Sequence, residues 1–157
     1  MVDPNSQKGP LATGAVLAMD HGMKRCGFAV ADALRLTMTP LAAYHGAGDG
    51  DGLVEHIVSL AGERTLSAIL IGLPLHQDKS QSTQSQLIRT VAERLALRLP
   101  TLRLLFIDEH LTSKEAESRL VEAGFTGQAR KDRRDSWSAL VMLEEWIENG
   151  ESLDSLS

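Results

Sequence analysis

The spacing of apolar residues changes once along this chain, and that change constrains the fold more than any other feature. Before the glycine-rich segment 46–52, short apolar runs occupy residues 15–20 and 26–31, and residues 36–44 supply a third run that contains Pro40. Short runs separated by polar turns predict strands, and the proline favours an edge position for the third. After the glycines, helical periodicity alternates with short apolar runs.

The second part of the chain therefore predicts helices and strands in alternation. Strands are predicted at 68–71 and 102–107, and the predicted helices cover 53–61, 87–99, 112–123 and a last stretch from Asp135 or Ser136 to Ile147. This order predicts an α/β fold with a mixed five-stranded sheet. A three-strand meander leads, helices and strands then alternate, and helices cover both faces.

Length and composition predict one domain. A chain of 157 residues that is 43% hydrophobic can fill a single core, which we assign to residues 14–149, with a flexible lead-in at 1–13 and a tail at 150–157. No apolar run reaches the roughly 18 residues of a membrane span, and the start lacks an export signal. We expect a soluble protein that is not exported. Cys26 is the single cysteine, which excludes an internal disulfide.

Acidic residues stand where predicted strands end. Asp20 follows the first strand, Asp108 and Glu109 follow the fifth, and Asp135 opens the last predicted helix. Ligands of α/β sheets bind outside the carboxyl ends of parallel strands, and hard cations such as Mg²⁺ choose carboxylate oxygens. Asp20, Glu109 and Asp135 could thus converge on a site for phosphoryl transfer. The alternative is that these acids cap helix amides or lie in solvent.

Several basic residues are candidates for contacts with substrate phosphates. They are Lys24 and Arg25 in the turn after Asp20, Lys79 in the polar loop 74–84, and Arg130, Lys131, Arg133 and Arg134 just before Asp135. Such charges are also common on solvated surfaces. With 16 Lys and Arg against 21 Asp and Glu, the net charge of −5 argues mildly against a nucleic-acid partner without excluding one.

Four motifs follow one another in a recognisable order. They are Asp20-x-Gly22-x-Lys24-Arg25-x-Gly27, Ile71-Gly72-Leu73-Pro74, Asp108-Glu109-x-Leu111-Thr112 and Asp135-x-x-Ser138-Ala139. Together they closely resemble the YqgF/RuvX family of Holliday-junction resolvase-like proteins, which is implicated in 5′-end maturation of precursor 16S rRNA. The resemblance spans about residues 14–148.

The resemblance implies an RNase H-like fold, dependence on Mg²⁺ or Mn²⁺, and residence in the cytoplasm. Residue by residue, it implies that Asp20, Glu109 and Asp135 are the catalytic metal ligands. Asp108 is the alternative to Glu109. His110 stands where the family has arginine, so a bidentate phosphate contact is lost there, although His110 remains a candidate for substrate binding or proton transfer.

The RNase H sheet order raises a question about Glu109. It places the fourth strand beside the first, so Glu109 on the fifth strand lies two strand spacings, ~10 Å, from Asp20 and must reach across. Adjacent residues at a strand end point to opposite faces, so only one of Asp108 and Glu109 looks toward Asp20. We expect Glu109, whose side chain is longer, and expect Asp108 to bond its local turn.

Three functions remain open from the sequence. The leading one is an endonuclease that acts on structured RNA or branched DNA, and the sequence leaves a homodimer open because a junction has two-fold symmetry. The others are a sugar-kinase or actin-like ATP-binding domain, which the chain's length disfavours, and a non-catalytic module for ribosomal or transcription machinery. Trp137 and Trp146 are interpreted as core or partner-facing anchors rather than base-stacking platforms.

Overall fold

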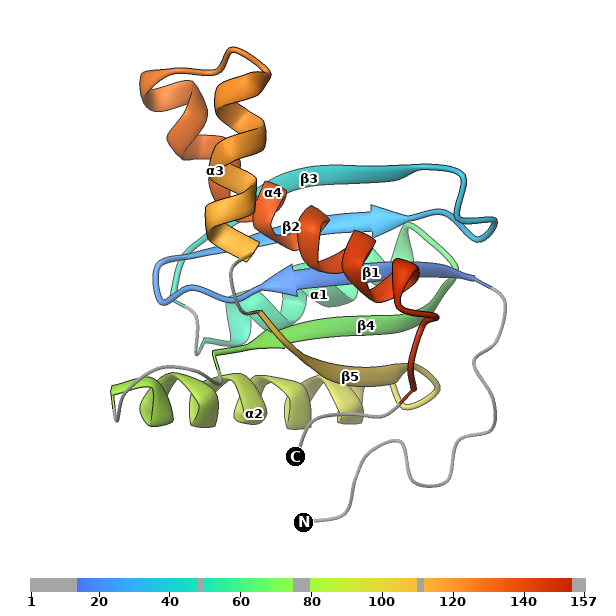
Figure 1. Cartoon of the computed structure of the whole chain (residues 1–157). Coiled ribbons are helices and arrows are strands. Elements are labelled where there is room, and N and C mark those ends of the chain that lie inside the picture. Colours follow the sequence, from blue (N-terminus) through green and yellow to red (C-terminus); the bar gives the residue numbers. More distant parts are fainter. Residues whose placement is uncertain (1–13, 48–49, 75–79, 110–111, 154–157) are drawn as a thin grey trace.

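The structure is a computed structural model that describes residues 14–47, 50–74, 80–109 and 112–153 (Figure 1). In chain order the elements are β1 (Ala15–Asp20), β2 (Arg25–Ala31), β3 (Met38–His45), α1 (Asp51–Gly62), β4 (Leu66–Leu73), α2 (Ser80–Arg98), β5 (Arg103–Asp108), α3 (Thr112–Glu122) and α4 (Gly127–Glu148). The predicted order of strands and helices is confirmed. The predictions for residues 1–13, Lys79 and His110 lie outside the described residues.

The five strands form one mixed sheet in the order β3-β2-β1-β4-β5. The meander β1-β2-β3 is antiparallel, and β4 and β5 extend it in parallel with β1. Pro40 lies on β3, an edge strand, as its missing N–H requires. The carboxyl ends of β1, β4 and β5 consequently meet at one end of the sheet.

Successive side chains of each strand point to opposite faces of the sheet, so the sheet separates two hydrophobic cores. Leu17, Met19, Ile69 and Ile71 belong to the core that includes α1 and α2, whereas Val16, Ala18, Ala68 and Leu70 belong to the core that α4 covers. Figure 1 shows α4 crossing one face of the sheet, with α1 behind the other. The predicted helices on both faces are confirmed. The many alanines beneath α4 let its backbone approach the sheet closely.

The prediction that the last helix begins near Asp135 or Ser136 was wrong. Helix α4 begins at Gly127, so Asp135 lies well inside it. The early turns of α4 project beyond the sheet with α3, against which α4 packs (Figure 1). Because no sheet lies beneath these turns, their sequence carries no apolar stripe of the kind that marks a sheet-covering helix.

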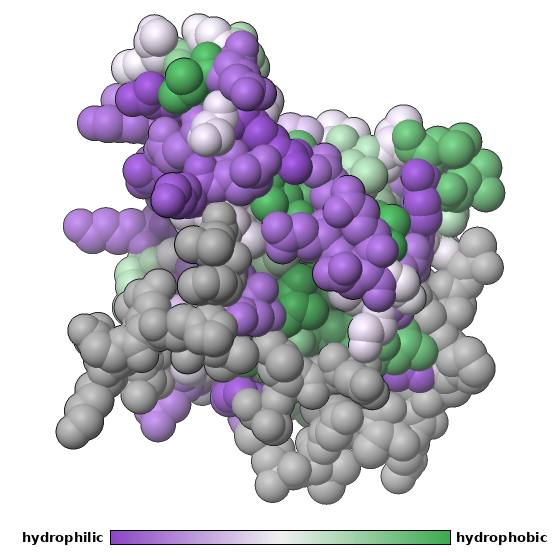
Figure 2. All heavy atoms as spheres, in the orientation of Figure 1, coloured by the Kyte–Doolittle hydropathy of each residue, from purple (hydrophilic) through white to green (hydrophobic). Residues whose placement is uncertain are grey.

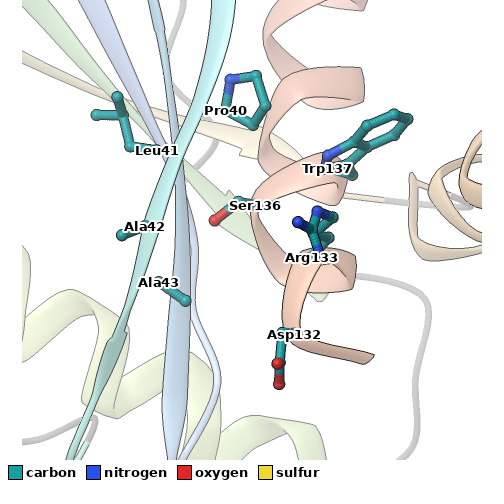
Figure 3. A pocket seen from close by; sticks show the side chains of 8 residues that line it. All are labelled: Pro40, Leu41, Ala42, Ala43, Asp132, Arg133, Ser136 and Trp137. Atoms are coloured by element: carbon teal, nitrogen blue, oxygen red, sulfur yellow. The ribbon is translucent and has the colours of Figure 1, made fainter. Parts of the chain in front are cut away.

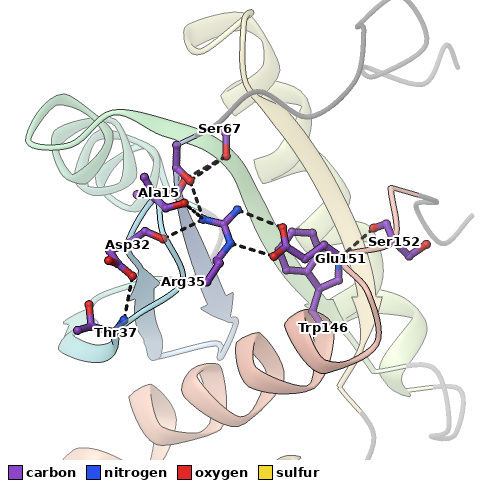
Figure 4. A network of polar contacts seen from close by, with 10 residues as sticks. Ala15, Asp32, Arg35, Thr37, Ser67, Trp146, Glu151 and Ser152 are labelled. Atoms are coloured by element: carbon purple, nitrogen blue, oxygen red, sulfur yellow. Dashed lines mark hydrogen bonds and ion pairs between the residues drawn. The ribbon is translucent and has the colours of Figure 1, made fainter.

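At the sheet end opposite Asp20, Arg35 fastens the β2–β3 turn to the chain that follows α4 (Figure 4). Arg35 takes a left-handed backbone conformation (φ 58°), and its guanidinium donates to both carboxylate oxygens of Glu151 at 3.0 and 3.1 Å. The same group donates to the carbonyls of Gly14 and Asp32. This clamp joins three segments of the chain far from the acidic end of the sheet.

Within the ranges that the structure describes, no helix is long and apolar enough to cross a membrane.

Candidate functional site

The side chains of Asp20 and Glu109 meet at the carboxyl ends of the parallel strands. Asp20 is the last residue of β1, and Glu109 follows β5 directly. Side chains two residues apart on a strand point to the same face of the sheet. Val16 and Ala18 of β1 and Leu105 and Ile107 of β5 point to the face that α4 covers, so Asp20 and Glu109 point to that face as well. Asp108, one residue earlier, falls on the opposite face. Asp20 and Glu109 share a side-chain hydrogen bond.

Gly72 on β4 explains how Glu109 crosses the strand between it and Asp20. Met19 pairs with Ile71, so the next residues, Asp20 and Gly72, lie side by side, and Gly72 pairs with Ile107 on β5. A Cβ atom on Gly72 would stand 2.9 Å from Glu109 Oε2 and 3.1 Å from Glu109 Cβ. The Glu109 side chain therefore lies over the bare backbone of Gly72. The backbone N–H of Glu109 also donates to the Leu73 carbonyl.

The contact between the two carboxyls shifts both of their pKa values. The pKa of Asp20 is raised well above its usual value, first by burial, then by the negative charge of Glu109 and their hydrogen bond. Asp135 raises it further, and Arg134 opposes the shift. Burial also raises the pKa of Glu109, and the charge of Asp108 adds to that shift, although the hydrogen bond from Asp20 lowers it. Two buried carboxyls in contact require either a shared proton or a cation.

Helix α4 brings Asp135 to the edge of this pair. Gly27 of β2 is the register partner of Asp20, and a Cβ on Gly27 would lie 2.0 Å from the carbonyl carbon of Asp135, so α4 rests on bare backbone here. The buried hydroxyl of Ser136 accepts the Phe28 N–H at 3.2 Å, which fixes the helix on β2. The Asp135 carboxylate pairs with Arg25 at 3.3 Å.

The donor set at this end of the sheet fits a hard divalent cation. Glu109 Oε2 is buried and accepts no hydrogen bond from the described residues, so one carboxylate oxygen beside Asp20 has no partner. Carboxylate oxygens are the ligands that Mg²⁺ and Mn²⁺ prefer. Among the residues described, no three His, Cys, Asp or Glu side chains are grouped closely enough to hold one ion as they stand. The structure thus brings Asp20 and Glu109 together and leaves Asp135 with Arg25.

The predicted phosphate-binding residues fall into two groups. Lys24 and Arg25 lie at the start of β2 beside the carboxyls, and Lys24 is exposed. Of the other predicted residues, the four that the structure describes lie on the projecting turns of α4. There Arg130 and Arg134 both face Glu117 of α3 at 3.6 Å, Arg133 stacks on the Phe125 ring, and Lys131 is exposed.

A family profile matches almost the whole of this fold. The profile of RuvX, described as a Holliday junction resolvase, matches residues 14–149. The chain belongs to the RuvX family. The resemblance inferred from the four sequence motifs is confirmed, and membership replaces the interpretation as an ATP-binding domain.

Named relatives of this RuvX chain agree with the profile. It is 35% identical over 136 residues to a "Putative pre-16S rRNA nuclease" of Dechloromonas aromatica, with 87% of this chain and 92% of the relative covered. A protein of the same name from an Anaeromyxobacter species is 34% identical over 133 residues, with 84% and 95% covered.

Solved structures confirm the RNase H-like fold of the RuvX chain. Thermus thermophilus RuvC in complex with a Holliday junction substrate aligns with a TM-score of 0.56 at 11% identity, covering 87% of this chain and 96% of RuvC. A further T. thermophilus RuvC structure aligns with a TM-score of 0.53. At this identity the likeness concerns the fold alone.

Sequence reasoning did not predict the packing roles of three residues that shape the site of this RuvX protein, although two of them, Gly27 and Gly72, stand in the motifs. Gly72 and Gly27 open space for Glu109 and α4, and Ser136 fastens α4 to β2. A signal for Gly72 was present, because Ala68, Leu70 and Gly72 alternate on the α4-facing side of β4 as Val16, Ala18 and Asp20 do on β1. Gly27 and Ser136 offered no comparable signal, since their roles depend on where α4 crosses β2.

Proposed function

We propose that this protein is a metal-dependent endonuclease that hydrolyses phosphodiester bonds in structured RNA during 5′-end maturation of precursor 16S rRNA. The observation that carries the proposal is the buried contact of Asp20 with Glu109, in which Glu109 Oε2 has no hydrogen-bond partner among the described residues. Membership of RuvX and the nuclease names of the relatives support the reaction class. Maturation of ribosomal RNA would take place in the cytoplasm.

Asp20 and Glu109 would hold Mg²⁺ or Mn²⁺, and Asp135 would join them once its carboxylate leaves Arg25. A bound ion of this kind supplies Lewis-acid stabilisation of the phosphoryl oxygens and lowers the pKa of a bound water. Asp108 faces away from Asp20 and acts through its charge, which raises the pKa of Glu109. The partly buried position of the pair would strengthen its hold on a cation.

The basic residues would position the substrate backbone. Arg25 offers a planar guanidinium beside the carboxyls, and a phosphate that binds it would draw it from Asp135. Lys24 and Lys131 are exposed point charges suited to phosphate oxygens, as are the arginines that follow Lys131 on α4. Contacts to phosphates do not depend on the base sequence of the substrate. We therefore expect replacement of these basic residues by uncharged ones to weaken binding about equally for substrates of different base sequence.

Metal-dependent cleavage of a precursor-rRNA leader tests the proposal, with a four-way DNA junction assayed in parallel because the family description names that substrate. We expect the RNA to be cut with Mn²⁺ and not with EDTA, and Asp20→Asn to abolish cutting while far-ultraviolet circular dichroism stays unchanged. Asp51→Asn is the matched control, since Asp51 lies on α1 and pairs with Arg94.

The outcomes separate the alternatives. Cutting of the junction alone, by a dimer in sedimentation, would favour a branched-DNA resolvase. Binding without cutting of either substrate, at saturating Mn²⁺, would favour a non-catalytic module. Full activity of Asp20→Asn would remove Asp20 from the site.

A further inference from the structure

A groove of about 390 Å³ lies between the edge strand β3 and α4, beside the acidic site (Figure 3). Residues 40–43 of β3 form one wall, and Asp132, Arg133, Ser136 and Trp137 of α4 form the other. Figure 3 shows Ser136 pointing from the helix toward the strand, Pro40 on the strand side of the helix, and Trp137 and Arg133 projecting from the helix. The groove thus combines an aromatic ring, a guanidinium and a carboxylate with a small apolar wall.

The aromatic and cationic groups of the groove are held in place by Phe125, in the connection between α3 and α4. The rings of Trp137 and Phe125 pack edge to face, with centroids 6.0 Å apart and planes at 78°. The Arg133 guanidinium lies 4.3 Å from the centre of the Phe125 ring and donates to the Ala129 carbonyl at 2.9 Å. No carboxylate pairs with Arg133 in the part of the chain described. Trp137 and Arg133 are therefore ordered before any ligand arrives.

The charge around the groove favours a nucleic acid. Arg130, Lys131, Arg133 and Arg134 gather on two turns of α4, although the whole chain carries −5. Hydrophilic residues predominate on the projection formed by α3 and the start of α4, with some apolar residues at its tip, as Figure 2 shows. Tryptophan and arginine offer stacking surfaces to any base, and the Asp132 carboxylate can accept from an exocyclic amino group. The same carboxylate would repel an acidic peptide.

The groove and the acidic site both include residues of α4. Trp137 stands two residues after Asp135, so their side chains leave α4 on different sides, and between them Ser136 is bonded to Phe28 of β2. A strand that crosses α4 at this point can place a base in the groove and its phosphates at Arg25 and the carboxyls. A base that is paired within a duplex offers no free face for stacking, so only an unpaired base fits.

We propose that the groove between β3 and α4 binds an unpaired base of the substrate, stacked on Trp137, close to the bond that is cut. This inference rests on the proposed function and specifies its substrate class, namely a nucleic acid with an unpaired nucleotide beside the scissile phosphate. Adenine, cytosine and guanine carry exocyclic amino groups, so they suit Asp132 better than uracil or thymine does.

Tryptophan fluorescence tests the proposal in the absence of cleavage. The chain has two tryptophans, and Trp146 is buried with its Nε1–H donated to the Ser152 carbonyl, so Trp146→Phe leaves Trp137 as the single reporter. In EDTA, we expect saturable quenching by a single-stranded octanucleotide of cytidine and little quenching by a duplex of equal length. Absence of quenching at saturating oligonucleotide would overturn the proposal.

A second measurement leaves Trp146 unchanged. Fluorescence anisotropy of the labelled octanucleotide should show that Trp137→Leu raises Kd roughly 5- to 150-fold, the range for loss of one base–aromatic stack, and Trp137→Phe less. The control is Leu97→Ala, because Leu97 is an exposed residue of α2. Equal affinities of Trp137→Leu and the control would overturn the proposal. So would a loss of self-association in Trp137→Leu with no loss of oligonucleotide binding, which would make the groove a protein interface.

These binding results do not depend on catalysis. If the wild-type protein cuts no substrate but Trp137 is still quenched, the proposed endonuclease function fails while the base-binding groove stands. If the protein cuts RNA and Trp137→Leu binds and cuts normally, the groove proposal fails alone.

Discussion

Gly72→Ala should impair the site while leaving the fold nearly as stable as before. The added Cβ would stand 2.8 Å from Met142 Sδ and 2.9 Å from Glu109 Oε2, whereas ordinary contact begins at 3.4–4 Å. Both atoms belong to the outer parts of flexible side chains, so they can move by the missing ~0.5–1 Å at modest cost. Glu109 Cβ, at 3.1 Å, must also shift by a few tenths of an ångström. The atom that must move most on the Glu109 side is, however, the carboxylate oxygen that we propose as a metal ligand.

The expected magnitudes follow from that displacement. Overpacking against rigid atoms lowers the unfolding free energy by ~1–3 kcal/mol. Replacing glycine by alanine recovers ~0.4–1 kcal/mol, because alanine restricts the unfolded chain. We therefore expect a net change in unfolding free energy within about 1 kcal/mol. A misplacement of about 1 Å in a catalytic group can lower a rate by ~10²-fold. We therefore expect cleavage to fall by roughly 10- to 100-fold.

Two other glycines provide matched controls. A Cβ on Gly27 would lie 2.0 Å from backbone carbon of Asp135, so Gly27→Ala must displace α4 and should destabilise the protein by more than about 3 kcal/mol. Gly62, at the end of α1, has nothing within 4 Å, and Gly62→Ala should change neither stability nor cleavage greatly.

Urea unfolding gives the free energies, and single-turnover cleavage of the precursor-rRNA leader at matched Mn²⁺ gives the rates. Electron paramagnetic resonance of bound Mn²⁺ measures ion affinity directly. Wild-type cleavage and Mn²⁺ affinity in Gly72→Ala would refute the placement of Glu109 as a ligand.

Three further predictions concern other parts of the chain. Glu109→Gln should lose Mn²⁺-dependent cleavage at an unchanged melting temperature, whereas Asp108→Asn should keep it, because Asp108 faces away from Asp20; the reverse pattern would promote Asp108. Burial raises the pKa of the Cys26 thiol to about 11, so its contribution to stability is present below about pH 8.5 and is lost as the pH rises through about 11. Iodoacetamide at pH 8 should accordingly label Cys26 only after unfolding, and rapid labelling of the native protein would contradict this. Glu151→Gln should weaken the clamp with Arg35 and lower the unfolding free energy by ~1–2 kcal/mol without changing cleavage, so an unchanged urea midpoint would show that the clamp contributes little.

Element order could be predicted from the sequence because it depends on local periodicity. The strands at 15–20 and 68–71 were visible as short continuous apolar runs, and the helix face of Ala139 and Leu143 was visible as a helical pattern. The structure places these residues in the two cores. The start of α4 at Gly127 was not visible. Its first turns pack on α3 and project into solvent, and a helix of that kind lacks the apolar stripe on which the prediction relied.

The contact between Asp20 and Glu109 required information that periodicity does not contain. The sequence places the two acids on strands that are not neighbours, ~10 Å apart. Whether the longer side chain can bridge that gap depends on the residue of β4 that lies beside Asp20, and hence on the register of β1 with β4. That residue is Gly72. Any larger side chain at this position would occupy the space that the Glu109 carboxylate fills.

The acidic net charge argued mildly against the predicted nucleic-acid partner, and the distribution of the charges shows why that argument has little weight. A count of 16 basic and 21 acidic residues treats all charges alike, yet on the α1–α2 side Arg94 and Arg98 are paired with carboxylates of α1. On the projecting turns of α4, Arg130 and Arg134 share the single carboxylate of Glu117, no carboxylate pairs with Arg133 within the described ranges, and Lys131 is exposed. A phosphate backbone responds to the local field within about a Debye length, ~8–10 Å at physiological salt. The relevant charge is therefore that of the α4 turns beside the carboxyls, where four basic side chains lie within one short segment, and the sum over the chain says little about binding there.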